Sequence, residues 1–516
     1  MSAASGNGVP LVRSVRWSLV YAVLSRGAVL VSVPIVLQRL GAPTYAAWVI
    51  SSALIYSQGL VDFGAGTVGR RFVAESASQD SRAGVVAVLR TMVAFYLVLS
   101  VVVGGALFVL APTIAGWLAD DSADQVTVLR YAAAAFCATN AVFVLAAVVE
   151  GSGRVDTSYR LQSVGAVLIV PLLLGSVELG AGVHAIGITW LVPPLLISVL
   201  LARAVWKLIV DLDPGASSDF SLRSLLGLAG GWQVSAWADF ASFQLPRVIA
   251  GFALPVSELV TLDLALRIAQ LVVFPLFAAY PVVLPLAVRT EHAHGRAALR
   301  GLVFELQRGV LVVALLAMAI TVPVAGVLIE TWTGGGAARV DAIVTFLIVF
   351  GVTSHASTGI VSATLVALGT VRTIVLYKTA QLALCLVLVV PGSALGVVPA
   401  AAALAIGLAL PAAWFLWQGL REVGVAQPWL GEPVAGLRLL AVAAACAAAV
   451  TVVVGATDGS PPLLGLLSGI ASGSVVAGLG LLWLDLTPHQ VRSRIRAQLG
   501  PAAPVGPAAP TPPPVY

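Results

Sequence analysis

Long apolar stretches separated by short polar connections fill most of this 516-residue chain. A transmembrane helix needs about 20 predominantly apolar residues, because the hydrocarbon core of a bilayer is about 30 Å thick. The pattern therefore predicts an all-α integral membrane protein with about 14 transmembrane helices. Their approximate bounds are 17–38, 44–66, 91–112, 128–149, 161–178, 182–203, 224–246, 258–285, 308–329, 340–366, 374–392, 397–420, 437–456 and 462–484.

The seventh and eighth predicted spans depart from a regular apolar helix. Asp239 and several amide side chains make the seventh span polar. The eighth span is long and contains Pro275 and Pro281, and we expect a bend at one of these prolines, which cannot complete the helical hydrogen-bond ladder.

The composition agrees with a membrane protein. Hydrophobic residues make up 59% of the chain and charged residues 10%, whereas soluble domains carry about 25% charged residues. The net charge of +5 does not indicate nucleic-acid binding, because the basic residues are scattered through short connections. The cysteines lie singly inside apolar spans, and His292 and His294 lie in a predicted cytoplasmic loop without a third ligand, so we expect no metal site and no cofactor.

The basic residues also predict the orientation of the chain in the membrane. If the N-terminus is cytoplasmic, 22 of the 28 Lys and Arg residues fall in cytoplasmic segments and 4 in the opposite ones. Cytoplasmic loops of membrane proteins carry an excess of Lys and Arg. We therefore expect a multi-pass protein of the cytoplasmic membrane with both termini on the cytoplasmic side.

The sequence contains an internal repeat. The motif Gly-x2-Arg-x4-Tyr-Arg/Lys is found at residues 151–160 and again at 369–378, an offset of 218 residues. The same offset places Arg71 on Arg289, each at the cytoplasmic exit of a span. Six spans per repeat give the two halves the same orientation, so they are expected to form two pseudo-symmetric six-helix lobes.

The repeat predicts four parts of the chain. These are an N-terminal lobe (1–215, helices 1–6), a C-terminal lobe (216–425, helices 7–12), two extra transmembrane helices (426–487) and a disordered cytoplasmic tail rich in Pro and Ala (488–516).

The region from Leu40 to Glu75 carries a resemblance to a known family. Its features are Leu40-Gly41, Tyr45, Trp48, Asp62-Phe63-Gly64, Arg70-Arg71 and Ala74-Glu75, in this order. The order resembles that of the polysaccharide and lipid-linked oligosaccharide flippases of the multidrug/oligosaccharidyl-lipid/polysaccharide exporter superfamily. The resemblance implies an alternating-access flippase that moves undecaprenyl-diphosphate-linked oligosaccharide across the cytoplasmic membrane for cell-surface polysaccharide biosynthesis.

Arginines inside the predicted spans are the main substrate-binding candidates. A charge within a span costs a few kcal/mol, so it usually faces protein or a water-filled cavity. We expect Arg26 and Arg267 to point into a cavity between the halves and to hold a diphosphate bidentately, with Arg247 as a third candidate. The alternative is that each arginine pairs with a carboxylate such as Asp239 or Asp263 and fixes helix packing.

Acidic and amide side chains supply the remaining candidates. Asp62, Asp239 and Asp263 are candidates for ion coupling, and for Asp62 the sequence favours a structural cap or gate. His355 suits a packing role better than a titrating one. Gln58 and Gln270 are substrate-binding candidates that suit a wet, sugar-tolerant lumen, but interhelical hydrogen bonds would explain them equally well.

Three functions fit these features to different extents. A flippase fits the motif order, the repeat and the intramembrane arginines. An ion-coupled small-molecule antiporter of the same superfamily is the alternative, although such exporters usually rely on acidic residues in an apolar pocket. A membrane-embedded polysaccharide polymerase fits less well, because no large outer loop and no catalytic motif is found, so we expect no enzyme activity.

The flippase interpretation implies a set of partners. They are polyprenyl diphosphate carrying the oligosaccharide, membrane lipid, and polysaccharide polymerase and glycosyltransferases of the same process, without nucleic acid.

Overall fold

A computed structural model describes residues 8–56, 58–62, 65–117, 123–214, 237–238, 240, 243–334, 341–425, 433–457, 461–484 and 493. Within these ranges the chain is helical, and the only β-type pairing is an isolated bridge between Ser81 and Asp213. Eleven of the described helical stretches are long and apolar enough to cross a membrane. The predicted all-α membrane fold is confirmed. The predicted seventh span, with Asp239, lies largely outside the described residues.

The chain forms two compact units. Unit 1 comprises Met1–Arg267, Ile329–Val340 and Leu382–Leu404, and unit 2 comprises Ile268–Leu328, Asp341–Gln381 and Ala405–Tyr516. These units differ from the four parts that the repeat predicts, since each unit takes segments from more than one part.

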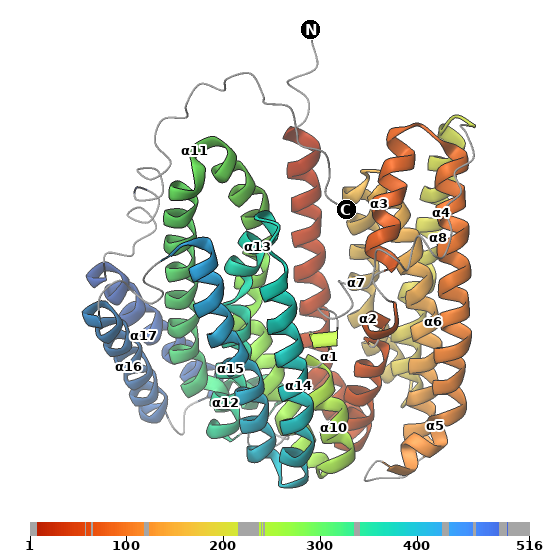
Figure 1. Cartoon of the computed structure of the whole chain (residues 1–516). Helices are drawn as coiled ribbons and strands as arrows, with labels where there is room; N and C mark the ends of the chain where they lie inside the picture. Colours follow the sequence, from red (N-terminus) through yellow and green to blue (C-terminus); the bar gives the residue numbers. More distant parts are fainter. Residues whose placement is uncertain are drawn as a thin grey trace. The chain divides into compact units, whose positions relative to one another are not determined.

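Unit 1 contains the first ten described elements. They are α1 (Gly8–Ile55), α2 (Gln58–Val61), α3 (Ala65–Ser78), α4 (Arg82–Leu99), the π-helical turn η1 (Ser100–Gly104), α5 (Gly105–Trp117), α6 (Ala123–Gly151), α7 (Val155–Glu178), α8 (His184–Asp211) and α10 (Leu245–Ala253). Helix α1 packs on α7, and α8 packs on both α6 and α7 (Figure 1).

The remaining helices begin with α11, whose ends belong to unit 1 and whose middle belongs to unit 2. They are α11 (Val256–Thr333), α12 (Ala342–Ala356), α13 (Gly359–Ala367), α14 (Arg372–Ala394), α15 (Val397–Val423), α16 (Pro433–Ala456) and α17 (Pro462–Trp483). The second half of α14 and the start of α15 also lie in unit 1.

Two glycines separate predicted spans that the structure joins into single helices. Helix α1 contains the first predicted span and the first half of the second, and it breaks between them at Gly41 (φ 86°, ψ 166°). Helix α11 contains the eighth and ninth predicted spans and breaks between them at Gly295 (φ 75°, ψ 177°). These positive φ angles are readily adopted only by glycine, which lacks the Cβ atom that would clash. The bend expected at Pro275 or Pro281 stays a prediction.

The second predicted span, 44–66, is not one continuous helix. Helix α1 ends at Ile55, α2 covers only Gln58–Val61, and α3 begins at Ala65. The Ala65 amide donates to the Asp62 carbonyl across the second interruption, at 2.9 Å. Interrupted transmembrane helices leave backbone groups outside the helical ladder and occur where protein or a wet cavity can satisfy them.

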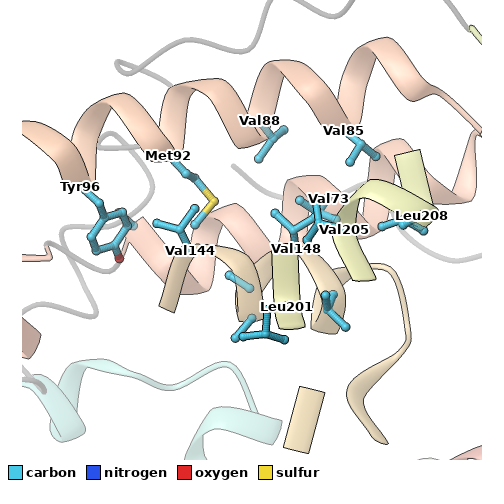
Figure 2. Close-up of a cluster of buried hydrophobic side chains, with 14 of the residues drawn as sticks. Val73, Val85, Val88, Met92, Tyr96, Val144, Val148, Leu201, Val205 and Leu208 are labelled. Carbon is cyan, nitrogen blue, oxygen red and sulfur yellow. The ribbon is translucent and has the colours of Figure 1, made fainter. Parts of the chain in front are cut away.

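A buried cluster from α3, α4, α6 and α8 holds this part of unit 1 together. Figure 2 labels ten of the side chains in this cluster: Val73, Val85, Val88, Met92, Tyr96, Val144, Val148, Leu201, Val205 and Leu208. Gly69 of α3 allows the close approach, because a Cβ at this position would lie 2.3 Å from the Met92 sulfur. The cluster therefore fixes α3 and the adjoining break against the bundle.

Glycines on one face of α17 let it pack closely in unit 2. A Cβ on Gly473 would lie 2.7 Å from a methyl of Val450 and 2.9 Å from Ile320, whereas a Cβ on Gly478 would meet nothing within 4 Å. The glycines on this face of α17 therefore serve helix packing.

We expect Gly473→Leu to destabilise unit 2 by about 1–3 kcal/mol, because the larger side chain must displace α16 or α11. Thermal unfolding of the purified protein in detergent measures the effect. Gly478→Leu is the matched control on the same helix, and equal unfolding temperatures for the two variants would contradict this account of packing.

Candidate functional site

The centre of the candidate site is the carboxylate of Asp263, two turns into α11. This side chain is fully buried, with 0% exposure. Its Oδ1 accepts a hydrogen bond from Arg247 Nε at 2.6 Å. Its Oδ2 accepts from Arg267 Nε at 2.6 Å and from the Tyr45 hydroxyl at 2.5 Å. One carboxylate thus holds two guanidinium groups and a phenol.

Helix geometry places these groups together. Asp263 and Arg267 are four residues apart on α11, so their side chains lie on one face of the helix. Tyr45 and Trp48 are three residues apart on α1, with ring centroids 5.4 Å apart. The Arg267 guanidinium lies 4.8 Å from the centroid of the Trp48 ring, a cation–π contact.

Helix α10 supplies Arg247 and anchors it. Arg247 Nη1 donates to the Phe243 carbonyl at 2.5 Å and lies 3.3 Å from Gln244 Oε1. Phe243 and Gln244 precede the first turn of α10, and Pro246 lies in that turn, where its missing amide hydrogen costs nothing. The position of Arg247 is therefore set by local backbone as well as by Asp263.

The charges of this cluster are buried together. Arg247 is 5% exposed and Arg267 is 7% exposed. The sequence leaves open the alternative that these arginines pair with a carboxylate such as Asp263. The structure has this arrangement. Neither guanidinium is open to solvent, and both Asp263 oxygens already accept charged donors, so cation binding at Asp263 would require the arginines to move.

Arg26 lies in a different environment. It is exposed on α1, and among the described residues no carboxylate lies within ion-pair distance of it. Tyr21, on the same helix, contacts Tyr159 of α7 in a tilted arrangement with ring centroids 5.6 Å apart. The charge of Arg26 acts on the Tyr21 hydroxyl, as does that of Glu150. Of the three candidate arginines Arg26, Arg247 and Arg267, Arg26 alone is exposed and therefore accessible to an external anion.

Glu150 of α6 is already engaged by other side chains. Arg70 Nη1 lies 2.8 Å from one of its oxygens, and the Ser158 hydroxyl donates to the other at 2.8 Å. Gln162 extends the network by donating to Ser158 at 2.9 Å. These contacts neutralise the Glu150 carboxylate near Tyr21. Glu150 therefore does not offset the positive charge of Arg26.

Asp62 lies at the break between α2 and α3. Its side chain is buried at 8% exposure, and Oδ2 accepts the Tyr96 hydroxyl at 3.0 Å. Its backbone carbonyl also accepts the Ala65 amide. These contacts fit the structural cap or gate that the sequence favours.

The remaining predicted residues are Gln270, Gln58 and Asp239. Gln270 is half-buried in unit 2, and the side chain of Gln58 in α2 lies outside the described part of the structure, as does Asp239. Within the described ranges, no group of three or more His, Cys, Asp or Glu residues is placed to hold a metal ion.

No motif in the sequence indicates directly that Tyr45 binds Asp263. The two residues are 218 positions apart, the offset of the internal repeat. Equivalent residues of two repeats approach each other most closely near a two-fold axis that relates the repeats. A search for polar residues at the repeat offset inside spans could therefore have found this pair.

We expect Asp263→Asn to destabilise the protein by about 3–5 kcal/mol, because it leaves two buried guanidinium groups without a carboxylate. Tyr45→Phe removes one donor and should cost less. Thermal unfolding in detergent measures both. The control is Glu178→Gln, which removes a surface pair with Arg39 whose side chains are 59% and 57% exposed and should cost about 1 kcal/mol or less. Equal stability of Asp263→Asn and the control would refute the role of the cluster.

Three solved structures resemble this chain in fold. The chain is similar to the lipid II flippase MurJ in an inward closed conformation, at 12% identity and a TM-score of 0.61, over 91% of this chain and 100% of that one. It is also similar to an inward-facing multidrug resistance MATE family transporter of the MOP superfamily, at 14% identity and a TM-score of 0.59, over 79% of this chain and 98% of that one. A MATE protein in the bent conformation matches at 15% identity and a TM-score of 0.51, over 81% and 96%. These similarities establish the fold.

The sequence itself identifies the family. A family described as polysaccharide biosynthesis protein matches residues 77–335, half of the chain. No curated protein matches the sequence. The chain belongs to this polysaccharide biosynthesis protein family, as the resemblance carried by Leu40–Glu75 predicts. Its fold is shared with the flippase and transporter structures named above.

Proposed function

We propose that this protein is a flippase that moves undecaprenyl-diphosphate-linked oligosaccharide from the cytoplasmic to the outer leaflet of the cytoplasmic membrane. The observation that carries the proposal is Arg26, an exposed guanidinium in the middle of a membrane span. Such a charge is costly against lipid, and a planar guanidinium binds phosphate oxygens bidentately. A diphosphate headgroup supplies the missing anion. The family description and the similarity to a lipid II flippase support a lipid-linked substrate.

The Asp263 cluster gives this flippase an outer closure. With both termini cytoplasmic, Tyr45 and Arg247 lie near the outer ends of their spans, and Asp263 joins α1, α10 and the first turns of α11. In our proposal the lobes rock, and outward opening separates Tyr45 from Asp263. Arg247 and Arg267 then exchange the carboxylate for the diphosphate of the cargo, which makes them substrate ligands in that state.

The same proposal gives the remaining residues their roles. Gln58 and Gln270 hydrogen-bond sugar hydroxyl groups, and Asp62 and Asp239 are the candidates for coupling to an ion. The protein acts without catalysing a chemical step, and it works beside the glycosyltransferases that build the cargo and a polysaccharide polymerase that consumes it.

A small-molecule antiporter is the alternative. The chain resembles a multidrug transporter in fold about as closely as it resembles the lipid II flippase, so the fold supports both functions equally. The two functions differ in the charge of the cargo. An antiporter for cationic drugs gains nothing from an uncompensated arginine in its path, since like charges repel.

We expect Arg26→Ala to reduce translocation at least about tenfold, the equivalent of about 1.4 kcal/mol, with unchanged expression. The assay uses vesicles containing the protein and a fluorescent sugar on undecaprenyl diphosphate, with accessibility to an impermeant lectin as the readout. Arg26→Lys should retain part of the activity, and Arg39→Ala is the control, because Arg39 lies in an exposed surface pair. Wild-type rates in Arg26→Ala, or drug efflux that does not depend on Arg26, would contradict the proposal.

A further inference from the structure

Three tyrosines from separate segments of unit 1 lie close to one another. Tyr21 of α1 and Tyr159 of α7 are both half-buried, and their rings lie tilted by 35° with centroids 5.6 Å apart. Tyr56, at the break that follows α1, is 59% exposed. The Tyr21 hydroxyl is within electrostatic range of Tyr56, Tyr159 and Arg26. Aromatic rings from separate segments thus lie near one exposed cation.

Packing does not account for the hydroxyl groups of these tyrosines. Among the residues that the structure describes, the hydroxyls of Tyr21, Tyr56 and Tyr159 have no hydrogen-bond partner. Tyr45 and Tyr96 are 0% and 2% exposed, and each donates to an aspartate. A polar group within the membrane-spanning part needs water or a ligand when protein does not satisfy it.

The internal repeat supplies a comparison within the same chain. Tyr159 and Tyr377 hold equivalent positions in the repeated motif, 218 residues apart. Tyr377 is 0% exposed, its hydroxyl lies 2.8 Å from His355 Nδ1, and its ring stacks on Phe415 at 4.6 Å. The fold therefore buries a tyrosine at this position in unit 2, while in unit 1 the ring and hydroxyl of Tyr159 stay accessible.

A sugar next to a diphosphate matches this surface chemically. A hexose presents C–H faces, which stack on aromatic rings, and hydroxyl groups, which exchange hydrogen bonds with phenols. Tyr21 and Arg26 are five residues apart, about 7.5 Å along the helix, which suits a diphosphate and the first sugar attached to it. By the predicted orientation, Tyr21 lies on the cytoplasmic side of Arg26, where the sugar end of an entering headgroup would lie.

We propose that Tyr21, Tyr56 and Tyr159 form a carbohydrate subsite beside Arg26, in which the rings stack on the sugar nearest the diphosphate. This inference rests on the proposed flippase function and adds the part of the cargo that each group recognises. Arg26 binds the diphosphate, and the tyrosines bind the sugar.

Binding of two lipids to the full-length protein in nanodiscs tests the subsite. The probes are undecaprenyl diphosphate alone and the same lipid carrying N-acetylglucosamine or galactose. We expect the wild type to bind the better of the two sugar-bearing lipids about tenfold or more tightly than undecaprenyl diphosphate alone. One good aromatic contact supplies about this much affinity. Tyr21→Ala and Tyr159→Ala should lose this preference, with less than about a twofold change for the bare lipid. Arg26→Ala should weaken binding of all probes.

Two further variants separate stacking from folding. Tyr56→Ala changes an exposed side chain, so it should fold normally and still reduce the preference for sugar. Tyr131→Ala is the matched control, because Tyr131 is a half-buried tyrosine of the same unit whose hydroxyl bonds to His184 at 2.7 Å, and it should keep the full preference. An unchanged preference in Tyr21→Ala, Tyr159→Ala and Tyr56→Ala, or an equal loss for bare and sugar-bearing lipid, overturns the subsite while leaving the flippase proposal in place. Failure of the wild type to bind any of the lipids overturns both.

Discussion

The carboxylate of Asp263 is the constraint on which the rest of the site depends. Inside a membrane protein, two guanidinium groups can be buried only if an anion and hydrogen-bond acceptors accompany them. Asp263 meets this need by placing one oxygen on Arg247 and the other on Arg267 and Tyr45. Because the donors come from different helices, the cost of exposing or separating the charges holds α1, α10 and the start of α11 together.

The intramembrane arginines divide into two kinds by this criterion. Arg247 and Arg267 are compensated and buried, so they stabilise the described state. Arg26 is exposed, and the nearby Glu150 is neutralised by Arg70. In the proposed flippase, a diphosphate cargo first binds Arg26 and then takes up Arg247 and Arg267 when Tyr45 and Asp263 separate. In this proposal, the ion pairs of Asp263 with Arg247 and Arg267 break and re-form as the protein alternates between its inward- and outward-open states.

The sequence predicted the fold well, because about 20 apolar residues in a row have few alternatives to a transmembrane helix. It did not predict the interruption at Asp62, since hydropathy is insensitive to a short loss of helical hydrogen bonds. The candidate site was predicted in part. Arg267 and Asp263 were both named, but composition cannot decide between a cavity and an ion pair, which depends on the position of Tyr45 on another helix. Whether Asp239 and Gln58 take part stays a prediction.

Accessibility of the chain beside Tyr45 tests the central claim most directly. Ala46 is 4% exposed and neighbours the cluster. A cysteine at this position, in a protein whose Cys137, Cys385 and Cys446 are replaced, can be labelled with a water-soluble maleimide. The account predicts that Asp263→Asn raises the labelling rate at least about tenfold, since local opening costs less without the ion pairs, while Glu178→Gln leaves it unchanged. Equal labelling rates in the two variants would contradict the claim that Asp263 keeps this region closed.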